Sequence, residues 1–282
     1  MTSLRQSMIA AYLGCPRRAQ YRYIEGVREP SNERAARGTA AHAGIEYALR
    51  RKMLGTPTTL AEVAQATRDA VARVSTDVDW SREEPSDRDA MADRAIAYAT
   101  HYVEHVAPGL DLVDVERQFQ TTIGDIPIHG TIDVVCRTQL RDTKTTSRAP
   151  SPAWGDPKYR LQLGVYALAW QAMHDDFDAP QMSGAIDFLV LSERKPKGKE
   201  PTREVRHLPV IIDADEIRGE VAVARETVRH VASRVRVGDY PRNPTACFEW
   251  SRPCPYMGAC QPHRASAVER ASAVEGGSNG QE

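Results

Sequence analysis

At 282 residues, with 41% hydrophobic and 27% charged residues, the chain can bury one sizeable core and is neither disordered nor fibrous. Its formal net charge of −1 excludes a protein that coats nucleic acid through a broad basic field, so any such contact must be local. No run approaches the roughly 18 apolar residues of a membrane span, and no secretion signal is visible, so we expect a cytoplasmic protein without membrane contact.

The predicted elements change in type near the middle of the chain. Helical spacing of apolar residues predicts helices over about 7–13, 17–24, 33–52, 60–74 and 87–106. Alternating and β-branched residues then predict an antiparallel meander of strands over about 110–123, 126–137 and 140–145. A helix over about 158–174, two strands over about 183–193 and 202–212, and a helix capped by Asp213 that runs to about Val237 follow.

This order predicts one α/β (α+β) domain over residues 1–264, in which helices flank a mixed central sheet behind a helical N-terminal part. Residues 265–282 are mostly small and polar and end in GGSNGQE. Because such a segment cannot bury enough apolar surface to order itself, we expect a disordered C-terminal tail.

Two carboxylates and a lysine fall on adjacent predicted strands. Asp133 lies in GTIDVV, and Asp142 and Lys144 lie in LRDTKT, where a spacing of two places both side chains on one face. The carboxylates can hold a hard divalent cation, and the lysine can orient water or stabilise charge on a phosphate. By spacing alone, Asp142 and Lys144 could instead form a surface ion pair worth only about 0–1 kcal/mol.

Five motifs occur in a fixed order along the chain: YLGCPRRAQYRYIEG, GTAAHAGIEYAL, HGTIDVV, LRDTKTT and YRLQLGVYALAW. This series resembles the PD-(D/E)xK nuclease superfamily in its RecB-like branch, which includes CRISPR-associated and phage Fe–S exonucleases and the AddB nuclease domain. The resemblance implies a restriction-endonuclease-like core in a bacterial or phage-encoded protein. It also implies Mg²⁺- or Mn²⁺-dependent exonuclease cleavage of DNA, on single strands or at free ends, in recombination, repair or phage DNA processing.

The resemblance also assigns roles to individual residues. It implies that His42, Asp133 and Asp142, with the backbone carbonyl of Thr143, bind the metal, that Lys144 is the catalytic lysine, and that Glu116 is an auxiliary acid. Gln162 and Tyr166, one helical turn apart, would orient the site or touch the substrate strand. The alternatives are an ordinary packed histidine at position 42 and a half-buried helix face at positions 162 and 166.

Four of the five cysteines form a separate candidate site. Cys247, Cys254 and Cys260 crowd into an irregular segment, and Cys15 is remote in sequence. In the resembling exonucleases, one early and three late cysteines bind a 4Fe–4S cluster, which here would join the two ends of the chain. The gap after Cys247 is longer than the usual C-x-x-C, which leaves its ligation open, and zinc is the alternative occupant. Cys136, on the strand of Asp133 but on its opposite face, is predicted to be a buried thiol.

Three other functions remain open at this stage. The chain could be an end-trimming nuclease subunit of a CRISPR-adaptation or recombination complex. It could also be a Fe–S DNA-binding subunit that no longer cuts, against which the complete set of Asp133, Asp142 and Lys144 argues. A zinc-dependent interaction module would need only the cysteine segment.

Overall fold

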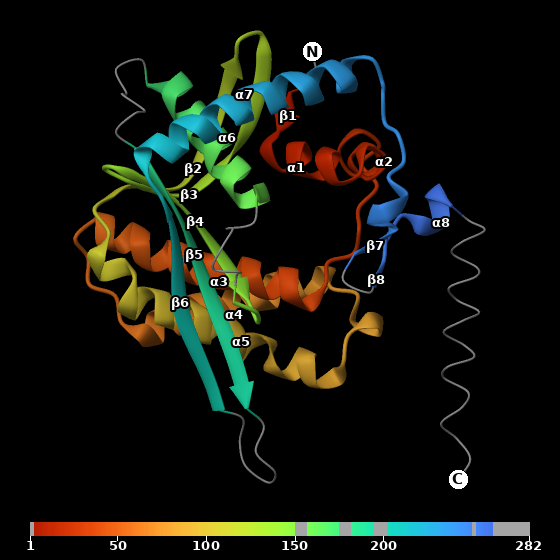
Figure 1. Cartoon of the computed structure of the whole chain (residues 1–282). Coiled ribbons are helices and arrows are strands. Elements are labelled where there is room, and N and C mark those ends of the chain that lie inside the picture. Colours follow the sequence, from red (N-terminus) through yellow and green to blue (C-terminus); the bar gives the residue numbers. More distant parts are fainter. Residues whose placement is uncertain (1–2, 150–156, 175–181, 195–201, 250–251, 262–282) are drawn as a thin grey trace, which may run out of the picture. The chain divides into compact units, whose positions relative to one another are not determined.

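The computed structural model describes residues 3–149, 157–174, 182–194, 202–249 and 252–261 (Figure 1). The chain divides into two compact units, Met1–Gln6 with Pro30–Arg229, and Ser7–Glu29 with His230–Glu282. The first unit holds all the predicted catalytic residues, and the second holds Cys15, Cys247, Cys254 and Cys260. The single domain over 1–264 stays a prediction, and the expected tail over 265–282 lies outside the described residues.

A mixed sheet of six strands forms the centre of the first unit, as predicted. Its strands are β1 (Leu4–Arg5), β2 (Leu112–Ile123), β3 (Ile126–Cys136), β4 (Gln139–Thr146), β5 (Ser183–Arg194) and β6 (Thr202–Ile212). The predicted meander is confirmed, because β2 pairs antiparallel with β3, and β3 with β4. The β4–β5 pair is parallel, with helix α6 (Pro157–Met173) as its crossover, and β6 returns antiparallel along the sheet edge.

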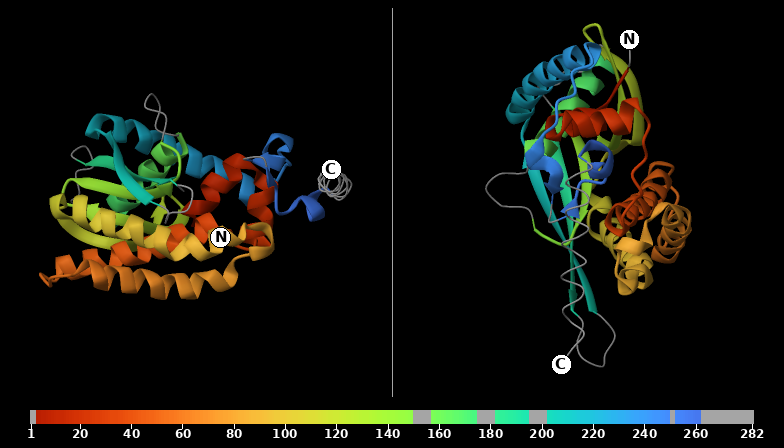
Figure 2. Two further views of the ribbon diagram at one scale, coloured as in Figure 1. Left: turned by 90° about the horizontal axis from the view of Figure 1, so that it is seen from below. Right: turned by 90° about the vertical axis from the view of Figure 1, so that its right-hand side faces the viewer.

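Helices cover both faces of this sheet (Figures 1 and 2). Helices α3 (Glu33–Met53), α4 (Leu60–Val74) and α5 (Pro85–His105) form a layer on one face, and their apolar residues make a core with the strands that includes Leu49, Tyr98, Tyr102 and Leu189. Helix α6 and the start of α7 (Ala214–Arg236) lie on the other face. They approach closely at Gly164, where a Cβ would lie 2.5 Å from the Glu220 carbonyl oxygen.

Side-chain caps fix where the long helices begin, because a cap supplies acceptors for backbone amides that have no partner within the helix. The Asn32 side chain accepts from the Ala35 amide at the start of α3, and Thr59 forms a capping box with Glu62 at the start of α4. Asp213 accepts from the Glu216 amide at 2.9 Å, which confirms it as the cap of α7. These helices therefore begin within a residue or two of the predicted positions.

The second unit is built from segments at opposite ends of the sequence. Its N-terminal part contains α1 (Gln6–Gly14), α2 (Pro16–Ala19) and the π-helix η1 (Gln20–Ile24), and its C-terminal part contains η6 (Pro244–Cys247), β7 (Phe248–Glu249), β8 (Arg252–Pro253) and α8 (Met257–Cys260). The Tyr12 hydroxyl donates to the Asp239 carbonyl at 2.6 Å, and the rings of Tyr21 and Tyr256 stack at 5.3 Å. These contacts hold the two segments together within the unit.

The helix predicted over 17–24 is instead a short α-helix that widens into a π-turn, a geometry that periodicity alone does not distinguish from an α-helix. Within the part of the chain that the structure describes, none of the helices combines the length and the apolar character that a transmembrane helix requires.

Candidate active site

The candidate site lies where the pairing between β3 and β4 ends. The two strands pair only from Cys136↔Gln139 to Val134↔Arg141, and β1 joins the same edge of β3 further along, at Ile128 and His129. Between these two pairings, the described strands leave residues 130–133 of this edge without a partner strand. Here the Asp133 carboxylate accepts from the Thr143 backbone amide at 3.0 Å, in place of a ladder hydrogen bond. We call this unpaired stretch the opening; through it, side chains from the two faces of the sheet can approach one another.

From the side of α6, a hydrogen-bonded set of side chains surrounds Asp142. The Lys144 Nζ lies 2.6 Å from Asp142 Oδ2, so the predicted placement on one face of the strand is confirmed. Gln162 donates through Nε2 to Asp142 Oδ1 at 2.7 Å, and Nε2 lies 2.6 Å from the Tyr166 hydroxyl. Lys144 also lies over the ring of Tyr159, 5.4 Å from its centroid. Asp142 is 1% exposed, so the weak surface ion pair considered as the alternative does not describe this site.

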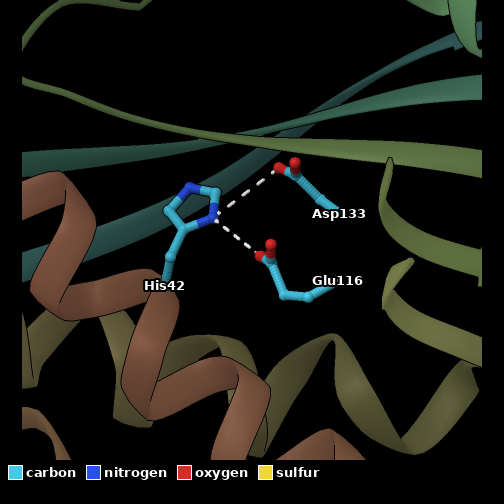
Figure 3. Close-up of side chains that lie close together, drawn as sticks. All are labelled: His42, Glu116 and Asp133. Carbon is cyan, nitrogen blue, oxygen red and sulfur yellow. Dashed lines mark ion pairs between the residues drawn. The ribbon is translucent and has the colours of Figure 1, made fainter. Parts of the chain in front are cut away.

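From the side of α3, His42 reaches the same opening (Figure 3). Its Nδ1 lies 3.6 Å from Asp133 Oδ2 and 3.8 Å from Glu116 Oε1, and its Nε2 lies 3.0 Å from the Thr143 carbonyl oxygen. One ligand atom from each of His42, Glu116 and Asp133 falls within 4.8 Å of the others. Three donors from three separate elements, α3, β2 and β3, therefore converge on one point.

Glu116 joins this group through an unusual backbone conformation. It lies on β2 opposite Asp133, between the pairs Val115↔Val134 and Arg117↔Ile132, and has a φ of 49°. Apart from glycines, it has the only positive φ in the described part of the chain. Such a conformation costs on the order of 1–3 kcal/mol, and strained residues of this kind cluster at functional sites. Sequence reasoning gave Glu116 only an auxiliary place, because neither the strand register nor this φ can be read from residue types.

Burial and charge shift the pKa values of the groups in the opening. Burial and the nearby Asp133 carboxylate raise the pKa of Asp142 to about 7, against the opposing effect of Lys144. Burial would lower the pKa of His42, but the Glu116 and Asp133 carboxylates outweigh it and raise the pKa to about 9. The pKa of Lys144 is likewise raised, because Asp142 and Asp133 outweigh its burial. Without a bound cation, burial and the nearby Asp133 therefore make the ionised form of Asp142 energetically unfavourable.

The donor set fits a hard divalent cation. Carboxylate oxygens and an imidazole nitrogen are ligands that Mg²⁺ or Mn²⁺ accepts, and a cation would neutralise the mutual repulsion of Asp133 and Asp142. Asp142 is not within the group of three at 4.8 Å, because Lys144 and Gln162 hold it. The opening continues into a cavity of about 600 Å³, which is lined by Arg34, Ala35, Gly38, Thr39, His42, Glu116, Asp133, Thr143, Lys144 and Thr145.

The four cysteines singled out in the sequence line one pocket in the second unit, together with Arg17, Arg18 and Arg242. None of them forms a disulfide, and among the described side chains no three of their sulfurs lie within 4.8 Å of one another. A tetrahedral zinc site with bonds of about 2.3 Å would place its sulfurs about 3.8 Å apart, so the described arrangement is wider than a closed zinc site. Cys136 is buried in the core beside α3 and α5, as predicted.

Comparison with known proteins gives a family and a fold. Residues 3–261 match the family model of the PD-(D/E)XK nuclease superfamily. The "Putative exonuclease" from Eubacterium rectale has a similar structure, with a TM-score of 0.53 and 9% identity over 92% of this chain and 93% of that chain. The structure of SSO0001 aligns over 91% of this chain and 95% of that chain at 12% identity, with a TM-score of 0.34. The curated proteins include no match.

Proposed function

Because this chain belongs to the PD-(D/E)XK nuclease superfamily, we propose that it is a Mg²⁺- or Mn²⁺-dependent deoxyribonuclease acting on single-stranded DNA or DNA ends. The observation that carries this proposal is the convergence of His42, Glu116 and Asp133 beside the Asp142–Lys144 pair. Metal-assisted hydrolysis of a phosphodiester needs a cluster of hard donors, and a nearby cation from the protein can stabilise the charge that develops on the phosphate; this opening provides both within one cavity.

In this proposal, His42, Glu116 and Asp133 hold the metal, with Asp142 and the Thr143 carbonyl as further ligands. The bound cation would polarise the phosphoryl oxygen and lower the pKa of water in its coordination shell. Glu116 thus becomes a ligand rather than an auxiliary acid. Two similar distances support this role. Glu116 Oε1 lies 3.8 Å from His42 Nδ1, and Asp133 Oδ2 lies 3.6 Å from the same atom.

Lys144 provides the positive charge for the reaction. Its ammonium stays protonated at neutral pH because Asp142 and Asp133 raise its pKa, so it can stabilise negative charge that develops on the phosphate. Gln162 positions this pair, since its amide holds Asp142 Oδ1 while Lys144 holds Oδ2. Tyr166 lies 2.6 Å from the same amide and fixes its orientation from α6. We therefore expect Gln162 and Tyr166 to act by positioning the pair.

A 4Fe–4S cluster in the pocket of Cys15, Cys247, Cys254 and Cys260 is the second part of the proposal. Its support is that four thiols from opposite ends of the chain line one pocket, spaced more widely than a single zinc ion requires. The three arginines of the pocket would offset the negative charge of four thiolates. The cluster would hold the two segments of the second unit together, a structural role.

Cleavage of end-labelled DNA tests the proposed activity. Purified protein would be incubated with linear and circular single-stranded DNA and with duplex DNA, with Mg²⁺, with Mn²⁺ or with EDTA. We expect metal-dependent loss of linear strands, intact circles, and loss of activity in Asp142→Ala and Lys144→Ala. Asp69→Ala, which removes an exposed carboxylate on α4, is the matched control and should cut normally. Equal degradation by wild type and both site variants would overturn the assignment.

A further inference from the structure

One wall of the active-site cavity is a single face of α3. Arg34, Gly38 and His42 recur at intervals of four residues and all line the cavity, together with Ala35 and Thr39. Residues four apart lie above one another on a helix, so these three form a row along its axis. At about 1.5 Å per residue, the row runs roughly 12 Å from the candidate metal ligand His42 to Arg34. The cavity therefore extends well beyond the space that a scissile phosphate needs.

Arg34 differs from the other three arginines of α3. Arg37 is buried and bonds Glu33 at 2.9 Å, Arg50 pairs with Glu46 at 2.7 Å, and Arg51 donates to the Pro57 carbonyl at 2.8 Å. Arg34 is exposed, and the described part of the chain offers it neither an ion-pair nor a hydrogen-bond partner. Its guanidinium is therefore available to a ligand at the far end of the row.

The cavity wall between His42 and Arg34 carries only small side chains, from Ala35, Gly38 and Thr39. Gly38 lies against β4, where an added Cβ would be 3.0 Å from Thr145 Oγ1. A bulky residue in this row would narrow the cavity, whereas the small residues leave room for a polynucleotide backbone along the helix. With the proposed cation on its ligands, positive charge would lie at one end of the row. The Arg34 guanidinium, which has no partner among the described residues, supplies it at the other end, and this arrangement suits a phosphate chain.

We propose that Arg34 binds a backbone phosphate of the substrate strand, so that the strand lies along α3 from the scissile bond at His42 to Arg34. Successive phosphates of an extended strand lie farther apart than the base-pair rise of a duplex, so the row of about 12 Å spans only a few nucleotides. This inference rests on the proposed nuclease function and adds a phosphate subsite to it. Arginine suits this role, because its planar guanidinium forms paired hydrogen bonds to phosphate oxygens.

Two substrates of different length distinguish this subsite from the metal site. Thymidine 5′-p-nitrophenyl phosphate occupies the reaction centre alone, whereas a single-stranded 20-mer reaches Arg34. We expect Arg34→Ala to raise KM for the 20-mer about tenfold, the size of one charge-assisted contact, and to leave kcat/KM for the small diester unchanged. Arg34→Lys should recover part of the loss, because the charge remains. The control is Arg68→Ala, which removes an exposed arginine of α4 that does not line the cavity.

Binding of the 20-mer in EDTA, followed by fluorescence anisotropy, tests the subsite without any cleavage. Loss of one phosphate contact should reduce the slope of log K against log salt by about 0.7 in Arg34→Ala. An affinity and a salt slope equal to those of Arg68→Ala would overturn the proposal, as would an equal loss of activity toward both substrates. If wild type cleaves neither substrate, the nuclease assignment fails, and the anisotropy measurement still decides the role of Arg34.

Discussion

The carboxylate of Asp133 accepts a hydrogen bond from the backbone amide of Thr143 at 3.0 Å, where β3 and β4 part. One side chain thus replaces the strand that would otherwise satisfy this amide. The same Oδ2 lies 3.6 Å from His42 Nδ1, so the atom that closes the opening in the sheet also faces the candidate metal ligands. Asp133 consequently serves both the hydrogen bonding of the sheet and the candidate metal site.

A first prediction follows from this double role. Asp133→Asn keeps an oxygen that can accept from Thr143 but removes the negative charge from the donor set. We expect cleavage to fall more than about 100-fold, because a metal ligand has a larger effect than the residues behind it, while the unfolding midpoint in urea changes little. Asp133→Ala removes both functions and should also lower the free energy of unfolding by about 1–3 kcal/mol. Equal stability of the two variants would show that the hydrogen bond to Thr143 contributes nothing.

A second prediction concerns Asp142 in metal-free protein. Burial raises its pKa from 3.8 to about 7, so the folded state holds this proton more tightly than the unfolded state does. Its contribution to stability is therefore present below pH 4 and is lost as the pH rises toward 7. As the pH rises from 5 to 8, the free energy of unfolding of wild type should therefore fall by about 1–3 kcal/mol relative to that of Asp142→Asn.

Urea unfolding in EDTA at the two pH values measures this shift. Saturating Mn²⁺ should stabilise wild type more than Asp142→Asn at pH 8, because the cation neutralises the charge that the variant lacks. A difference between the two proteins that does not change with pH would contradict the buried, perturbed carboxyl. Asp69→Asn, on the exposed side of α4, provides the matched control.

Much of this fold is predictable from the sequence, because its elements depend on local patterns. Apolar spacing and the Asp213 cap locate α3, α4, α6 and α7, and strand alternation locates the meander that carries Asp133 and Asp142. The early end of β3–β4 pairing and the positive φ of Glu116 depend on how strands meet in space. For that reason the sequence locates the elements that carry the candidate residues, but not the way in which these residues meet.

The buried ion pair behind β4 also escaped sequence reasoning, and it carries a third prediction. Arg141 bonds Asp187 twice, at 2.9 and 2.6 Å, and His207 Nε2 lies 2.7 Å from the same carboxylate. Burial alone would raise the pKa of Asp187, but His207 and Arg141 outweigh it and lower the pKa. This depressed pKa contributes stability above about pH 4, which is lost as the pH falls through the folded value.

Asp187→Asn should therefore cost about 3–5 kcal/mol at pH 7, because it leaves Arg141 buried without its partner charge. The cost should shrink toward pH 3, because Asp187 is then largely protonated in the unfolded chain and the folded carboxylate contributes less stability to wild type. Chemical unfolding at both pH values measures this, with Asp93→Asn as the control, since Asp93 pairs with Arg203 at 3.2 Å but is 62% exposed. Equal costs for the two variants would mean that burial of this pair is irrelevant to stability.

The cysteine pocket gives the last prediction, for which the chain contains its own control. Neither Cys15 nor Cys136 forms a disulfide, but Cys15 lines the pocket and Cys136 lies in the core beside α3 and α5. If the pocket holds a 4Fe–4S cluster, Cys15→Ala should lose the iron, the brown absorbance and much of the stability of anaerobically purified protein, because ligation contributes folding free energy. Cys136→Ala should keep full iron and lose only about 1–2 kcal/mol from a small cavity. Full iron content in Cys15→Ala would show that Cys15 is not a ligand. Colourless wild-type protein that contains zinc would show that the pocket holds zinc instead of the cluster.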